Sequence, residues 1–269
     1  MQPNTMMPPF DAKASSQNRE ETVRNLRRML ARATGSSAET AALPFNLAGI
    51  DAHFPQGGLP LGALHEIAPR TTADVAAAFG FMAALLGRMA KADRTQGPIL
   101  IVTGPNGVDE QGLPYGHGLH RLGLDPARVL LVTTKNDRQT QWALEEALRS
   151  ALPAAVAGVI ETLGFRTSQR LQLAAENAGR PLLLLRPSGI AGTSVAMTRW
   201  RIGAAAAARD RFGLITHWRW KVTLERCRNG RPGEWLVEFD HAYRFSLAAA
   251  MVDPALPRSA NARAFRHAG

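Results

Sequence analysis

The sequence predicts an α/β fold in which a mostly parallel, doubly wound sheet has antiparallel strands appended at its C-terminal side. Between residues 43 and 185, short apolar runs alternate with helical patterns, which is typical of parallel strands joined by crossover helices. After residue 195 the apolar residues recur with a period of two and turn signals separate the runs, which is typical of antiparallel hairpins.

Chain length and composition indicate one large domain, which we expect to span residues 43–247. The 269 residues are 45% hydrophobic, enough to bury a full core. A single cysteine, Cys227, excludes an internal disulfide and favours a reducing cytoplasm. The start of the chain is polar and predicts no signal peptide, and the longest apolar run, residues 75–86, is too short to span a bilayer. We therefore expect a cytoplasmic protein without membrane contact.

The two ends of the chain differ from this domain. Residues 1–17 and 248–269 show little periodicity and are predicted to be disordered. Residues 18–42 are predicted to form an amphipathic helix, capped by Asn18 and Glu21, and a small, polar linker. The helix carries a narrow apolar stripe, which we expect to dock on another protein or on the chain's own domain: Val23, Leu26 and Leu30.

The alternating segments place the elements of the parallel part in order. A glycine-rich turn and the first strand occupy residues 43–67. Further strands are predicted at 99–102, 129–132, 156–160 and 181–185. Helices are predicted at 73–91, 137–150 and 167–178, the last of them ended by Gly179. In the second helix the predicted core residues are Trp142, Leu144 and Leu148, and the predicted exposed residues are Glu145 and Glu146.

The segment 54–86 has the order of a phosphate-binding P-loop: strand, loop and helix N-terminus. A P-loop needs glycines whose N–H groups point inward, a lysine for the phosphate charge and a hydroxyl for Mg²⁺. The loop here has no glycine, no lysine and no Ser or Thr after a lysine, and Pro69 removes one N–H group. The motif alone favours an ordinary strand–loop–helix. The degenerate positions are Pro69, Arg70, Thr71, Thr72, Asp74, Val75 and Ala76.

Basic residues gather in the predicted C-terminal strands. The net charge is +10, which suggests an anionic partner such as nucleic acid, although an arginine-rich solvated surface explains it equally. Alternation in 198–202 and 217–226 places the first four basic residues opposite the tryptophans, and Arg226 in the other phase. We interpret this face as a contact for a DNA backbone or for a protein partner. Its residues are Arg199, Arg201, Arg219, Lys221, Arg226, Arg228 and Arg231.

No catalytic or metal-binding arrangement can be assembled from the sequence. His117 and His120 have ligand-like spacing, but Gly116 and Gly118 predict a loop there, so no metal is expected. The glycine-rich stretch 189–194 has no lysine and no following helix, so it is predicted to be a mobile surface loop.

Several runs resemble one protein family. The run 57–62 ahead of Glu66 resembles the strand that enters the P-loop of RecA-type recombinases. Residues 49–51, 63–66, 218–220 and 228–233 are most similar to the ImuA family. These are degenerate RecA-like proteins encoded beside ImuB and an error-prone polymerase in damage-induced mutagenesis cassettes. The resemblance covers roughly residues 43–250.

The resemblance implies a RecA-like core that has lost its nucleotide chemistry. The Walker A turn falls on 69–76, and Glu161 ends the strand that normally carries the Walker B aspartate. Residues 103–105 replace the water-activating glutamate, and 165–169 and 187–194 replace the two DNA-binding loops. No cofactor is expected.

The implied function is that of a non-catalytic adaptor in SOS-induced translesion synthesis and mutagenesis. The implied partners are ImuB, through it the error-prone polymerase and the sliding clamp, and RecA as a further contact, with weak DNA contact. Two alternatives remain open: a divergent RecA-type ATPase that uses Glu161 and Arg70, and a non-specific single-stranded DNA-binding protein.

Overall fold

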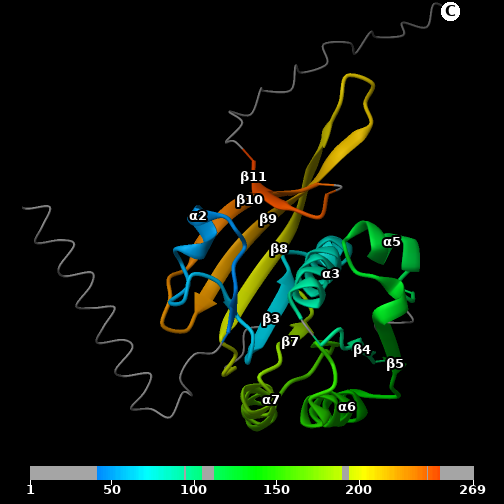
Figure 1. Cartoon of the computed structure of the whole chain (residues 1–269), viewed down its shortest axis with the longest axis vertical. Helices are drawn as coiled ribbons and strands as arrows, with labels where there is room; N and C mark the ends of the chain where they lie inside the picture. Colours follow the sequence, from blue (N-terminus) through cyan, green and yellow to red (C-terminus); the bar gives the residue numbers. More distant parts are fainter. Residues whose placement is uncertain (1–40, 94, 105–111, 190–193, 241, 249–269) are drawn as a thin grey trace, which may run out of the picture.

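A computed structural model describes residues 41–93, 95–104, 112–189, 194–240 and 242–248 (Figure 1). The predicted N-terminal helix and the predicted C-terminal tail lie outside these residues, except for positions 41, 42 and 248. The main sheet has nine strands in the order β11-β10-β9-β8-β3-β7-β6-β4-β5. The strands are β3 Leu64–Pro69, β4 Ile99–Thr103, β5 Val129–Thr133, β6 Ala155–Val159, β7 Leu182–Leu185, β8 Thr198–Arg209, β9 Ile215–Cys227, β10 Gly233–Phe239 and β11 Phe245–Leu247.

The fold is a mixed α/β architecture with a large, mostly parallel sheet, as predicted. The six strands from β8 to β5 are parallel, and β9, β10 and β11 continue the sheet in antiparallel pairing. A small second sheet pairs β1 with β2 ahead of β3. The short elements are β1 Ala42–Leu43, α2 Ala48–Asp51, β2 Leu59–Pro60, η1 Thr72–Asp74 and η2 Pro126–Arg128.

Helices cover both faces of the parallel part. In β7, Leu183 and Leu185 pack toward the core that contains α3, whereas Leu182 and Leu184 pack toward α6 and α7. Alternate residues of one strand therefore serve two cores, which is why this strand is apolar throughout. The helices are α3 Val75–Ala92, α5 Gly116–Arg121, α6 Asp137–Ser150 and α7 Phe165–Ala178.

An aromatic cluster forms the core on the α3 side of the antiparallel part. Trp200 is fully buried, with its ring 5.9 Å from those of Phe45, Phe54 and Phe81. Phe81 also meets Trp220 at 5.8 Å. Trp200 and Trp220 therefore face the core, as the period-two alternation of residues 200–202 and 218–224 indicates.

The apolar segment that contains α3 is longer than the apolar run of residues 75–86 identified in the sequence. With the turn before it, residues 72–92 form a 21-residue segment that is long and apolar enough to cross a membrane. However, 56% of the apolar window is buried inside the fold, and ten residues of α3 are buried. This pattern is that of the central helix of a packed sheet.

The predicted orientation of α6 is wrong at two positions. Leu144 and Leu148 are buried as predicted, but Trp142 is 64% exposed and Glu145 is only 6% exposed. The reason is α7, which packs beside α6 and provides Arg170. The Glu145 carboxylate lies between Arg170 and Arg149, so its charge is paired where it is buried.

Other differences are local. Residues 116–121 form α5, a short helix, where Gly116 and Gly118 predicted a loop. Residues 165–169, which replace a DNA-binding loop in the RecA resemblance, begin α7, two residues earlier than the predicted start at residue 167. The end of α7 is confirmed: Gly179 adopts φ +62°, a left-handed conformation that glycine adopts without steric cost.

A buried hydrogen-bond chain joins β2, β3 and β8. Trp200 Nε1 donates to Thr198 Oγ1 at 2.8 Å, and Thr198 Oγ1 lies 2.8 Å from His65 Nδ1. His65 Nε2 lies 2.8 Å from the Pro60 carbonyl oxygen, which can only accept. The chain is therefore satisfied by neutral His65 with the proton on Nε2 and the Thr198 hydroxyl donating to Nδ1. Burial lowers the pKa of His65 to about 4, although the bond to Pro60 opposes this shift.

We expect His65 to make the protein acid-sensitive. Between pH 6.5 and about 4 the unfolded chain binds a proton at this residue and the folded chain does not, so the free energy of unfolding falls as the pH falls. The loss is about 1.4 kcal/mol per pH unit in this window. Denaturant unfolding of the wild type and of His65→Gln at several pH values measures the difference in slope. His117→Gln, an exposed histidine on α5, is the control, and equal slopes in wild type and His65→Gln would contradict the assignment.

Candidate functional site

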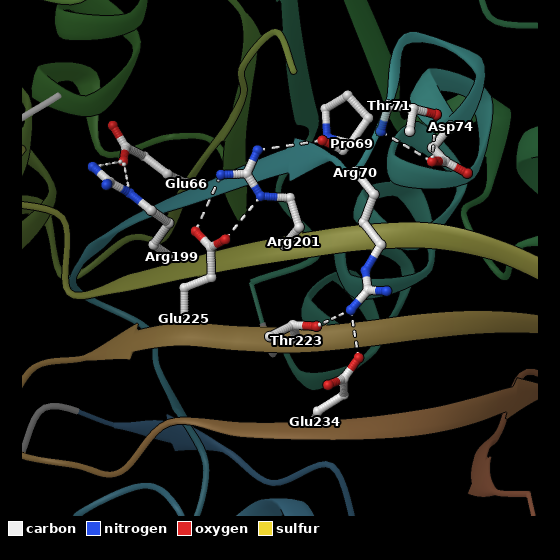
Figure 2. Close-up of polar contacts among 10 residues, drawn as sticks. All are labelled: Glu66, Pro69, Arg70, Thr71, Asp74, Arg199, Arg201, Thr223, Glu225 and Glu234. Carbon is white, nitrogen blue, oxygen red and sulfur yellow. Dashed lines mark hydrogen bonds and ion pairs between the residues drawn. The ribbon is translucent and has the colours of Figure 1, made fainter. Parts of the chain in front are cut away.

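The loop after β3 is closed by its own side chains (Figure 2). The Asp74 carboxylate accepts from the Thr71 N–H at 3.0 Å, from the Thr71 hydroxyl at 2.7 Å and from the Ala204 N–H of β8 at 2.8 Å. The Arg70 N–H donates to the Ile202 carbonyl oxygen at 2.8 Å. An internal carboxylate thus takes the N–H and the hydroxyl of Thr71, two donors that this loop could otherwise offer to an anion.

This arrangement also explains the charge state of Asp74. The bond from the Ala204 N–H, followed by that from the Thr71 hydroxyl, lowers the pKa of Asp74, and the charge of Arg70 adds to the effect. Val75 and Ala76 then begin α3, where they offer no cation. The predicted degenerate positions therefore form one turn, in which the Asp74 carboxylate accepts the hydrogen bonds of Thr71. Thr72 is exposed in the short helix η1.

Arg70 points away from the loop and along the sheet. Its guanidinium donates to Thr223 Oγ1 at 3.0 Å and forms an ion pair with Glu234 (Figure 2). The side chain passes over Gly203, where an added Cβ would come within 2.8 Å of Arg70 Cδ. A larger residue at position 203 would displace Arg70.

Glu161 follows β6, two strands from β3, because β7 lies between them. It is exposed, and its N–H lies 3.4 Å from Asp137 Oδ1. The sequence analysis missed Arg186, which follows β7 directly and is 7% exposed. Burial lowers the pKa of its guanidinium, while the carboxylates of Glu66 and Asp137 act in the opposite direction. An arginine immediately after a fully apolar strand was the available signal.

The predicted basic strand face exists, but glutamates pair with three of its seven predicted residues. We name it the polar sheet face. It is the side of β3, β8, β9 and β10 opposite the tryptophans, outside the part of the sheet that α7 covers. Arg199, Arg201, Arg219 and Lys221 share it as predicted. Three of its ion pairs join Arg199 to Glu66 at 3.0 Å, Arg201 to Glu225 at 2.9 Å and Arg219 to Glu238 at 2.6 Å.

These pairs change what the face can do. With Arg70–Glu234, four arginines meet four glutamates, so a phosphate would compete with a carboxylate for each guanidinium. Lys221 is exposed, and no ion pair is formed by it within the part of the chain that the structure describes. Whether the face contacts DNA or a protein stays a prediction.

A β-bulge places Arg226 on this face. Arg199 is opposite Arg226 and Trp200 is opposite Leu224, so Glu225 is the extra residue in β9. The extra residue reverses the alternation, and the phase predicted for Arg226 is wrong for this reason. Its Nη1 donates to the Ser194 carbonyl oxygen at 2.7 Å. Arg228 and Arg231 lie in the turn after β9, where Arg231 donates to the Ala52 carbonyl oxygen at 3.2 Å.

No metal centre forms among the described residues, where no three histidine, cysteine or carboxylate side chains gather. Cys227 is buried, and burial raises the pKa of its thiol to about 11. Its thiol is therefore protonated at neutral pH and is a poor nucleophile.

We expect charge reversal to destabilise the protein at Arg219 but not at Lys221, two positions further along the same strand. Arg219 and Glu238 are each 17% exposed, so Arg219→Glu sets two partly buried carboxylates together and is expected to lower the free energy of unfolding by roughly 1–3 kcal/mol. Lys221→Glu, on the same strand and exposed, is expected to change it by less than about 0.5 kcal/mol. Denaturant unfolding measures both. Equal effects of the two variants would show that the Arg219–Glu238 pair does not stabilise the sheet.

The comparison with known proteins agrees with the resemblance drawn from the sequence. No protein-family model matches the chain. Protein ImuA of Caulobacter vibrioides strain NA1000 / CB15N and Protein ImuA of its strain ATCC 19089 / CIP 103742 / CB 15 are each 32% identical to it over 237 residues. The match covers 81% of this chain and 93% of each relative. The chain belongs to the ImuA family.

Proposed function

We propose that the protein is a non-catalytic, RecA-like adaptor in SOS-induced translesion DNA synthesis and mutagenesis. One observation carries the loss of catalysis: the Asp74 carboxylate accepts hydrogen bonds from the Thr71 N–H and hydroxyl and from the Ala204 N–H, so a negative charge of the chain itself stands at this loop. A triphosphate approaching the loop meets a fixed negative charge and no lysine.

Membership of the ImuA family supports an association with the mutagenesis cassette. The proposed partner is ImuB, and through it the error-prone polymerase and the sliding clamp, with RecA as a second contact. The protein acts in the cytoplasm and joins the nucleoid during the response to DNA damage. These assignments follow from the family resemblance, and the paired charges of the polar sheet face are consistent with a protein contact.

The order of segments supports a RecA-like core. The glycine-rich turn, β3, the closed loop and α3 follow one another as strand, loop and helix do in a P-loop protein. The rival ATPase function needs Arg70 and Glu161 at one phosphate. Arg70 is engaged by Thr223 on β9 and Glu234 on β10, which lie on one side of β3 in the sheet, whereas Glu161 follows β6 on the other side.

We expect the full chain to show no ATP binding by calorimetry up to millimolar nucleotide. Asp74→Ala removes the internal anion but adds no lysine, so this variant is also expected not to bind ATP. It is expected to lose roughly 1 kcal/mol of stability with its capping contacts. Micromolar ATP binding by the wild type that Glu161→Ala abolishes would overturn the proposal in favour of an ATPase.

Partner binding tests the adaptor role and the predicted N-terminal helix together. Purified ImuB is expected to bind the full chain, and deletion of residues 1–40 is expected to weaken that binding at least about tenfold. The melting temperature is expected to stay within about 2 °C, because the stripe of Val23, Leu26 and Leu30 is too narrow to anchor the helix firmly on the domain. Leu26→Asp should reproduce the deletion, and Arg27→Ala is its matched control. Unfolding of the deletion variant would instead assign the helix to the core.

A further inference from the structure

The hairpin of β8 and β9 extends past the rest of the sheet (Figure 1). Its end carries exposed apolar side chains. β3 pairs with β8 only as far as Ile202, and β10 pairs with β9 only as far as Trp218. Beyond these points the two strands pair only with each other. We name residues 209–215 the hairpin tip.

Three apolar side chains of the tip face solvent. Phe212 is 71% exposed, Leu214 is 65% exposed and Ile215 is 43% exposed. Single exposed apolar residues are ordinary, but three within four positions concentrate apolar side chains at the end of a projecting hairpin. Such a concentration is typical of a contact site.

The turn that carries these side chains is fixed by Asp210. Its carboxylate accepts from the N–H groups of Phe212 at 2.8 Å and Leu214 at 2.9 Å, and its own N–H donates to the Leu214 carbonyl oxygen at 2.9 Å. Gly213 adopts φ +80°, which this turn requires. A rigid turn loses little conformational entropy on binding, so the exposed apolar groups are preorganised for insertion.

The charge of the tip is positive where it faces outward. The Asp210 carboxylate is engaged inside the turn, while Arg209 donates to the Gly213 carbonyl oxygen at 2.6 Å and the Arg211 guanidinium lies 4.7 Å from the Phe212 ring centroid. Arginine at the border of an apolar contact is complementary to carboxylates around an apolar pocket.

We propose that the hairpin tip inserts into an apolar pocket rimmed by carboxylates on a protein partner. The inference rests on the proposed adaptor function and names the surface that performs it. A single-stranded nucleic acid fits less well, because two aliphatic side chains gain nothing from base stacking and only two arginines stand near enough to meet phosphates.

A second copy of this chain also fits less well. The groove between α6 and α7 has a volume of about 410 Å³ and an apolar floor that includes Leu148 and Leu173. Its rim carries Arg149 and Arg170, which already neutralise Glu145. A basic tip meets a basic rim there.

The test measures binding of the full chain to purified ImuB. Phe212→Ser combined with Leu214→Ser is expected to weaken binding at least about tenfold. Arg209→Glu combined with Arg211→Glu is expected to slow association and to reduce its salt dependence. Leu173→Ser, an exposed apolar residue of α7, is the matched control and is expected to stay within about twofold of the wild type. Thermal unfolding checks that all variants fold.

The outcomes separate the two proposals. If the wild type binds ImuB and the Phe212/Leu214 variant binds equally well, the tip inference is overturned and the adaptor role stands. If the wild type does not bind ImuB, the proposed partner is wrong. The tip inference is then tested by photo-cross-linking in DNA-damaged cells, with p-benzoylphenylalanine in place of Phe212 or, for comparison, in place of Trp142 on α6. The tip inference is supported if a protein is cross-linked from position 212 but not from position 142. That protein, once purified, must also bind the Phe212/Leu214 variant at least about tenfold more weakly than it binds the wild type. Nucleic-acid adducts alone, or no adduct, overturn the tip inference.

Discussion

The fold depends on a chain of hydrogen bonds through His65, which joins β3 to β8, the parallel strand that borders the antiparallel part of the sheet. Thr198 is the first residue of β8. Its hydroxyl accepts a hydrogen bond from Trp200 Nε1 and donates one to His65 Nδ1 on β3. His65 in turn holds Pro60 of β2, so the glycine-rich entry segment, the central strand and the aromatic cluster share one network. Each member is buried and has a partner, and a buried polar network that is fully satisfied specifies one arrangement of its elements.

The polar sheet face follows from the same alternation. Since Trp200, Trp220 and Val222 occupy the core side, the intervening residues of β8 and β9 must lie on the other side. There the sequence provides arginines and glutamates on neighbouring strands, and they pair in the plane of the sheet. The face is therefore a charged but largely neutralised surface.

Strands, helices and the α/β class could be predicted because each depends on local periodicity. The bounds of α6 and the stop at Gly179 are examples. The predictions that were wrong concern features that depend on contacts between residues far apart in the sequence. Glu145 is buried because Arg170 lies on another helix, and Arg199 is paired because Glu66 lies 133 positions earlier. In the loop, the missing lysine is visible in the sequence, but the bond between Asp74 and Ala204 spans 130 positions. A single extra residue, Glu225, was enough to reverse the phase expected for Arg226.

Asp74 has one more consequence. A carboxylate that is covalently part of the chain is a ligand that never dissociates, and its effective concentration at the loop exceeds that of any free anion in a cell. Nucleotide-driven switches depend on two states, with the γ-phosphate present or lost. A built-in anion has only one state, so the junction between β3 and β8 keeps a single conformation whatever the energy charge of the cell. In the proposed adaptor, the timing of action then lies outside the molecule, in the amounts of the protein and its partners that are made.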